Sequence, residues 1–111
     1  MTRTLNDPTR CFICRRNATG FGVNRGDNVG WLCLPCRDSF SGVHAVAVPT
    51  ETFDRYERDA LIFAGNEGGE YLDSVGITDL SQLPPEQYQR FLEIIIHSFG
   101  EGMRHACGVE A

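Results

Sequence analysis

Apolar side chains recur at steps of three and four residues in the last third of the chain, the spacing of one face of an α-helix. Pro85 and Glu86 precede them, and both residue types favour the first turn of a helix. The pattern therefore predicts a long helix over residues 85–107. Its apolar positions are Tyr88, Phe91, Leu92, Ile95, Phe99, Met103 and Ala106, and Ile94 and Ile96 widen the face.

An apolar face of this breadth predicts that the last helix forms an interface. One arrangement is a homodimer through residues 85–107. The other is a monomer, in which an earlier helix over residues 51–64 covers the face together with Phe12 and Ile13. The sequence leaves both arrangements open.

The middle of the chain predicts shorter elements. Residues 43–48 are apolar and precede a proline, which suggests a strand or an extended link. Residues 51–64 carry apolar side chains at helical spacing. Two glycines within residues 66–69 predict a flexible break, because glycine weakens a helix interior. Residues 70–75 then form one or two helical turns, and Gly76 ends them.

The N-terminal third predicts a β-hairpin. Residues 21–23 and 29–32 are short apolar runs, and residues 24–28 between them are rich in turn formers. A short helix is expected over residues 37–40, and Gly42 is placed to end it.

Four cysteines flank this hairpin as two C-x-x-C pairs with eighteen residues between them. This is the spacing of a four-thiolate zinc site, and four thiolates fill every position of a tetrahedral ion. We therefore expect one structural zinc per chain and no catalysis, because no coordination position is left for water. The expected ligands are Cys11, Cys14, Cys33 and Cys36.

Each C-x-x-C pair can form a turn called a zinc knuckle. A knuckle, a hairpin, a second knuckle and a helix follow one another in a treble-clef finger, whereas a zinc ribbon would end in a strand. The fold class we expect is small α+β. A treble-clef-like four-cysteine zinc finger with an N-terminal arm occupies residues 1–42, and a mainly helical part with the long helix occupies residues 43–111.

Other interpretations of the cysteines remain in competition. An iron–sulfur cluster or redox-active thiols use the same residue type. The base deaminases need a histidine motif before P-C-x-x-C, and nucleases of the HNH type need a histidine pattern; neither is present. His44 lies close enough in sequence to replace one cysteine, although an ordinary packed or surface histidine fits better. Cys107 is unpaired, and we expect it to pack at a helix end.

Composition limits the class of protein and the compartment that we expect. The chain is 41% hydrophobic and 10% aromatic, too apolar for a disordered protein. No apolar run approaches the roughly 20 residues of a membrane span, and the N-terminus lacks the apolar stretch of a signal peptide. We therefore expect a cytoplasmic protein, in a host cytoplasm if phage-encoded, whose reduced thiols favour metal over disulfides.

The charge of the chain is unevenly divided. Residues 1–44 carry a formal +3 and residues 45–111 a formal −8, which together give the net −5. Four thiolates and a zinc ion would lower the first value to about +1, a weak basic patch for a nucleic-acid-binding domain. We therefore expect a protein-interaction module first, and a small DNA- or RNA-binding regulator as the alternative. The alternative would use Arg10, Arg15, Arg16 and Arg25, and Arg15 and Arg16 also fit a role as donors beside the thiolates.

Residues 11–40 resemble the zinc-binding domain at the N-terminus of the Clp protease unfoldase. The resemblance covers about a quarter of the chain and does not extend to any ATPase motif. In that family the module binds adaptors and substrates and pairs with itself, which implies a protein-interaction role. The matching residues are Cys11, Cys14, Gly30, Trp31, Cys33 and Cys36.

The whole chain is similar to small uncharacterised zinc-finger proteins of phages and prophages, mostly from alphaproteobacteria. These proteins combine an N-terminal cysteine module with a tail like residues 69–73 and 76–80, followed by a Pro-Glu helix with a late Phe-Gly. The resemblance carries no established activity. A phage origin would imply an adaptor or an inhibitor of a host system, an anti-CRISPR protein among them.

Overall fold

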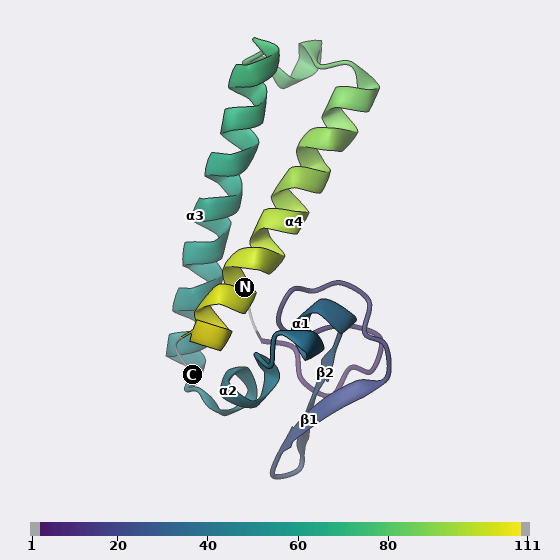
Figure 1. Ribbon diagram of the computed structural model, residues 1–111, viewed down its shortest axis with the longest axis vertical. Coiled ribbons are helices and arrows are strands. Elements are labelled where there is room, and N and C mark those ends of the chain that lie inside the picture. The colour runs from purple at the N-terminus through teal and green to yellow at the C-terminus, as the bar shows by residue number, and fades with distance from the viewer. Residues whose placement is uncertain (1–2, 110–111) are drawn as a thin grey trace.

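Two long antiparallel helices dominate the chain and stand on a smaller N-terminal part (Figure 1). The computed structural model describes residues 3–109, and it measures 49 × 24 × 22 Å along its principal axes. The helices are α3 (Thr50–Val75) and α4 (Pro85–Val109), and a short 3₁₀ turn, η1 (Leu80–Gln82), lies between them. The protein is thus a small α+β structure with a helical C-terminal part.

The predicted hairpin is present, and its strands are slightly longer than expected. Strand β1 (Phe21–Arg25) pairs antiparallel with β2 (Asn28–Leu32), in the register that sets Phe21 opposite Leu32. Gly26 occupies the turn at φ 60°, a left-handed conformation that glycine adopts without steric cost. The following short helix, α1 (Leu34–Asp38), begins and ends earlier than the expected residues 37–40.

The segment that was expected to be extended is a helix, α2 (Gly42–Ala47), so that prediction was wrong. Gly42 begins this helix rather than ending the one before it. A Cβ atom at Gly42 would lie 2.9 Å from Leu32 Cδ1, so the helix starts in close contact with the sheet. A short apolar run does not distinguish a strand from a buried helix, and here packing on the sheet favours the helix.

Helix α3 is continuous, and the predicted break at residues 66–69 does not occur. Gly68 is buried against α4, where an added Cβ atom would lie 3.0 Å from Phe91 and Ile95 side chains. The close packing offsets the weak helix propensity of glycine. The helix ends where the sequence predicted, because Gly76 adopts a left-handed φ of 71°.

The last helix matches its prediction at the N-terminus and continues to Val109. It approaches α3 closely at Gly102, where a Cβ atom would lie 3.1 Å from the Cβ atom of Ala60. Within residues 3–109, no helix combines the length and apolar character needed to cross a membrane.

One hydrophobic core joins the N-terminal part to the base of the helical hairpin. The rings of Phe12 and Phe53 stack with centroids 6.2 Å apart, and Ile13 is fully buried. Met103 and Cys107 of α4 are also fully buried in this core. Phe12 and Ile13 thus share one buried cluster with residues of α3 and with the C-terminal half of the α4 face.

Candidate functional site

The four predicted cysteines converge on one point in the N-terminal part. Their sulfur atoms all lie within 4.8 Å of one another, and all four residues are buried. The first pair belongs to the loop before β1, whereas the second lies where β2 passes into α1. Cys33 is the N-cap of α1 and Cys36 lies in its first turn, so the start of the helix directs both sulfurs to the same side. The cluster has the composition and spacing of a site that can hold a metal ion.

The first pair of cysteines lies in a tight turn. The backbone amide of Arg15 donates to the Cys11 carbonyl across 3.0 Å, and the Cys11 amide donates to the Arg16 carbonyl across 2.7 Å. Arg15 has a positive φ of 69°, which reverses the chain after Cys14. The amide of Phe12 donates to the Trp31 carbonyl across 3.0 Å and so attaches the turn to β2.

The four thiols interact strongly with one another. Cys14 and Cys33 have their sulfurs 3.4 Å apart. Hydrogen bonds from Cys14, Cys33 and Cys36 lower the pKa of Cys11, whereas the interaction with Cys11 raises the pKa of Cys36. Ionisation of one thiol therefore changes how readily the others lose their protons. A divalent cation bound by four thiolates releases those protons, so its affinity increases with pH.

The charged donor to this cluster comes from the last helix. Arg104 Nη1 donates to Cys36 Sγ across 3.5 Å. Burial lowers the pKa of the Arg104 guanidinium, but the bond to Cys36 and the charge of the cluster raise it by more. The sequence suggested Arg15 and Arg16 as such donors and missed Arg104, because 68 residues separate it from Cys36 and no local pattern connects them.

Arg15 connects the first cysteine pair to α3. Its Nη2 atom lies 2.6 Å from Oε2 of Glu57, whose side chain is only 2% exposed. Arg25 donates to the Ala47 carbonyl across 2.7 Å. Arg16 is exposed, and its side chain makes no hydrogen bond or ion pair within residues 3–109. Arg15 and Arg25, two of the four arginines proposed for nucleic-acid binding, thus have partners inside the protein.

The remaining candidates lie away from the cluster or serve as packing residues. His44 is not part of the four-cysteine group; its Nε2 atom lies 3.0 Å from the Tyr56 hydroxyl. Cys107 is fully buried, as expected, and burial raises the pKa of its thiol to about 12. His97 is exposed and pairs with Glu101 across 2.7 Å.

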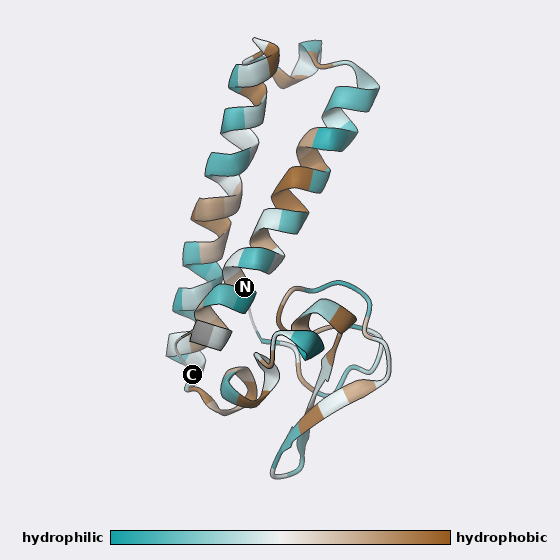
Figure 2. Cartoon of the chain, viewed as in Figure 1, coloured by the Kyte–Doolittle hydropathy of each residue, from teal (hydrophilic) through white to brown (hydrophobic). Residues whose placement is uncertain are grey.

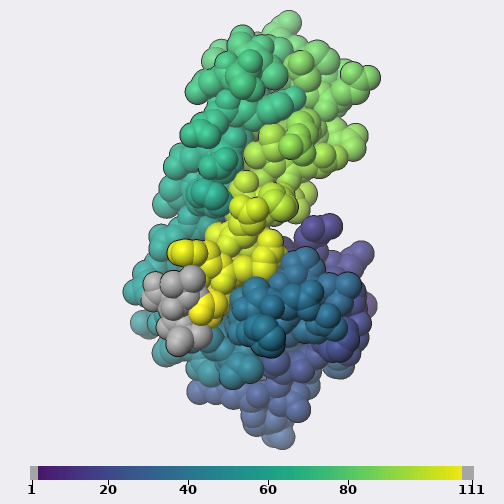
Figure 3. Space-filling view, in the orientation of Figure 1, coloured from purple at the N-terminus to yellow at the C-terminus, as the bar shows by residue number. Residues whose placement is uncertain are grey.

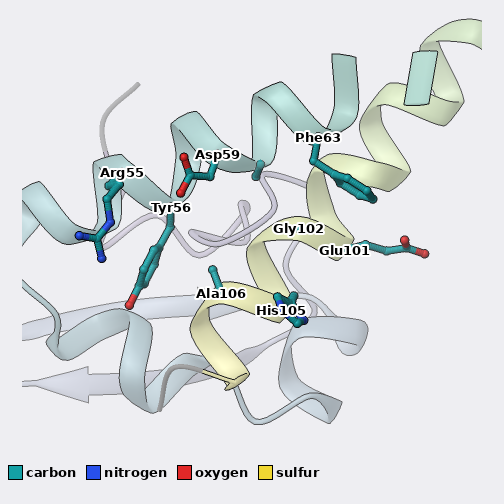
Figure 4. Close-up of a pocket in the computed structure, with 9 residues that line it drawn as sticks. Arg55, Tyr56, Asp59, Phe63, Glu101, Gly102, His105 and Ala106 are labelled. Carbon is teal, nitrogen blue, oxygen red and sulfur yellow. The ribbon is translucent and has the colours of Figure 1, made fainter. Parts of the chain in front are cut away.

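Two grooves flank the base of the helical hairpin. The first, of about 640 Å³, lies between α3 and α4, and Figure 4 shows its walls. Side chains of both charges line it together with the small residues Ala60, Gly102 and Ala106, and the two helices approach closely where Gly102 faces Ala60. The charged and polar side chains are Arg55, Tyr56, Asp59, Glu101 and His105.

The second groove has a volume of about 900 Å³ and lies between the turn of the first cysteine pair and the two long helices. We call it the knuckle groove, after the zinc-knuckle shape of that turn. Its charged lining is mainly basic, and its apolar lining comes from both long helices. The residues that define it here are Arg15, Arg16, Leu61, Arg90, Ile96 and Phe99.

The fold and the cysteine cluster define a small α+β protein with a candidate metal centre beside a helical hairpin. The chain belongs to a family of unknown function (DUF6511), whose model matches residues 51–109. No curated protein and no solved structure matches the chain. The matched region consists of α3, η1 and α4, so the family is defined by the hairpin, and the four cysteines lie outside the match.

Proposed function

We propose that the protein is a non-catalytic zinc-binding module that acts by binding another protein. The observation that carries the zinc assignment is the convergence of four buried cysteine sulfurs within 4.8 Å. Four thiolates complete the tetrahedral coordination that zinc prefers, so the metal stabilises the fold and does not activate water. The order of a cysteine turn, hairpin, second cysteine pair and helix α1 supports a treble-clef-like finger over a zinc ribbon.

Metal analysis of the purified chain tests the zinc assignment. We expect one zinc per chain, and a Cys33→Ser variant should lose the metal and unfold residues 1–42. Cys107→Ala is the matched control, because it removes a buried thiol outside the cluster and should retain zinc. Iron with a visible absorption band, or a metal-free protein with the same fold, would contradict the proposal.

The protein-binding role is supported by a closed metal site together with apolar side chains that the chain leaves exposed. Leu61, Leu92 and Ile96 of the helical hairpin are each at least 40% exposed. Exposed apolar patches of this kind mark interaction surfaces in small proteins. The resemblance to phage proteins favours an inhibitor of a host system, such as an anti-CRISPR protein, or an adaptor.

A pull-down from host lysate, followed by binding of the purified partner, tests the role. We expect a protein that binds the zinc-loaded chain and not the Cys33→Ser variant. The absence of any partner that binds in purified form would contradict the role.

Nucleic-acid binding is the second candidate, and exposed Arg10 and Arg16 on the first cysteine turn favour it. Binding to duplex and single-stranded oligonucleotides across a salt series separates the two functions, because phosphate contacts give a steep salt dependence. Micromolar affinity that the double variant Arg10→Ala, Arg16→Ala abolishes would place nucleic acid first, because neither exposed side chain supports the fold.

A further inference from the structure

A single apolar stripe runs along α4, and the rest of the chain covers only half of it. The stripe follows steps of four and three residues, which keep side chains on one helix face. Towards the C-terminus of α4 the stripe is buried against the N-terminal part, and towards the N-terminus of α4 it is exposed. The exposed fractions are 45% for Tyr88, 40% for Leu92, 54% for Ile96, 7% for Phe99, and zero for Met103 and Cys107.

The knuckle groove lies where this cover ends. Figure 3 shows a notch at the edge of the molecule, between the yellow-green atoms of α4 and the purple atoms of the N-terminal segment. Ile96 lines the groove from α4, and Leu61, which is 45% exposed, lines it from α3. Figure 2 shows brown apolar residues in the middle of α4, beyond the part of the helix that lies against the N-terminal part. The groove is therefore continuous with the exposed half of the stripe.

The charge of the groove is opposite to that of the molecule. Arg15, Arg16 and Arg90 line it with Glu93 as the single carboxylate, while the whole chain has a net charge of −5. Arg15 is paired with buried Glu57, and Arg90 lies 3.7 Å from Glu93. Arg16 has no such partner within the described residues, so it presents its full charge at the rim of the groove.

We propose that the knuckle groove and the exposed stripe bind an acidic amphipathic helix of a partner protein. This inference rests on the proposed protein-binding function and identifies the surface and the chemistry of the partner. Apolar side chains of the partner at steps of three and four would pack on Leu92, Ile96 and Leu61. Carboxylates beside them would pair with Arg16 and Arg90, since guanidinium groups bind carboxylates in a directed, two-pronged geometry.

The structure favours this occupant over the two others that a basic, apolar groove admits. Single-stranded nucleic acid stacks its bases on exposed aromatic side chains, whereas in the groove Leu61 and Ile96 are aliphatic and Phe99 is only 7% exposed. A second copy in a two-fold dimer would bring the same patch onto itself, so Arg16 and Arg90 would face like charges. An acidic segment satisfies both the arginines and the apolar floor.

Selection from a displayed library of random peptides of about 16 residues, long enough for four helical turns, tests the proposal on the zinc-loaded chain of 111 residues. We expect the enriched peptides to carry leucine-like residues at helical spacing with flanking aspartate or glutamate. Synthetic copies should bind at least about tenfold more weakly to Arg16→Glu and to Ile96→Glu, as expected for residues at the centre of an interface.

Two matched variants control for charge and hydrophobicity. Arg58→Glu and Ile62→Glu make the same changes on exposed positions of α3 outside the knuckle groove, and should leave peptide affinity within about twofold. Zinc content should be equal in all four variants, which shows that each retains its N-terminal fold.

Several outcomes would overturn the proposal. Peptides that bind all four variants equally well would reject the groove and leave the protein-binding function standing. If no peptide is enriched and oligonucleotides bind in an Arg16-dependent manner, both the groove assignment and the protein-binding function fail. If light scattering shows a dimer that Ile96→Glu dissociates and Ile62→Glu does not, a second copy of the chain is the occupant.

Discussion

Arg104 Nη1 lies 3.5 Å from Cys36 Sγ, so a positive charge from the last helix reaches the cysteine cluster. Four thiolates around a divalent cation carry a net charge of about −2. A half-buried guanidinium beside this site reduces that charge and fixes the orientation of one ligand. The helical hairpin that defines the family therefore contributes directly to the environment of the candidate metal site in the N-terminal part.

An Arg104→Gln variant should bind the proposed zinc ion about 10- to 100-fold more weakly, the usual cost of losing a partner of a metal ligand. Competition with a chromophoric chelator measures the affinity. Arg58→Gln, an exposed arginine on α3, is the control and should bind zinc like the unchanged protein. Equal affinities for the two variants would show that the contact has no role in metal binding.

Substitution of Arg15 by methionine should destabilise the protein by about 3–5 kcal/mol, because it leaves the buried Glu57 carboxylate without its cation. Glu57 Oε1 is already a buried oxygen with no hydrogen-bond partner among the described residues. The double variant Arg15→Met, Glu57→Gln should recover much of the loss, since no buried charge remains. Urea denaturation measures the free energy of unfolding of the unchanged protein, the single variant and the double variant. A single variant as stable as the unchanged protein would contradict this account.

Two glycines of the hairpin should respond to alanine in opposite directions. Gly65 is exposed in the interior of α3. An added Cβ atom at Gly65 would have no described residue within 4 Å, apart from its chain neighbours and the backbone of its own helix. Gly65→Ala should therefore stabilise the folded protein by about 1 kcal/mol. Gly102→Ala should destabilise, because its Cβ would lie 3.2 Å from the backbone of Ala60. Thermal unfolding measures both, and a shift of the same sign would contradict the close helix crossing.

The buried thiol of Cys107 should resist alkylation in the folded protein at about pH 8, because its pKa is raised to about 12 and the thiolate is the reactive form. The same shift has a consequence for stability. In the unfolded chain the Cys107 thiol ionises near its usual pKa of 9.0, whereas in the folded protein it stays neutral up to about pH 12. The stability that the buried neutral thiol contributes is therefore complete below pH 9.0 and is lost as the pH rises towards 12.

Mass spectrometry after iodoacetamide treatment should therefore find Cys107 unmodified until denaturant is added. Between pH 9 and 12, Cys107→Ala should lose less stability with rising pH than the unchanged chain. Rapid modification of Cys107 in the native state would show that the helix end opens.

Local signals in the sequence predicted the cysteine cluster, the β-hairpin and the start of α4. Each depends on residues close together in the chain, such as Pro85 before an apolar repeat. The errors arose where distant contacts decide the structure. Two glycines suggested a break in α3, but Gly68 is packed against Phe91 and Ile95. The apolar run now in α2 is helical because it packs on the sheet.

The candidate site shows the same limit. Spacing alone identified all four cysteines, since both pairs belong to one continuous N-terminal segment. The contact of Arg104 with Cys36 depends on how the last helix returns to the N-terminal part. The ion pair of Arg15 with Glu57 likewise depends on the path of α3. No period or motif in one sequence encodes either approach.

The shared core has a practical consequence for working with this family. The family match begins at residue 51, inside the first turn of α3. A fragment cut there would keep both long helices but would uncover Phe53, Met103 and Cys107, which are now fully buried. Such a fragment should aggregate or bind another protein through these exposed side chains. Expression of the hairpin therefore needs the preceding fifty residues, or an engineered replacement that shields the same apolar base.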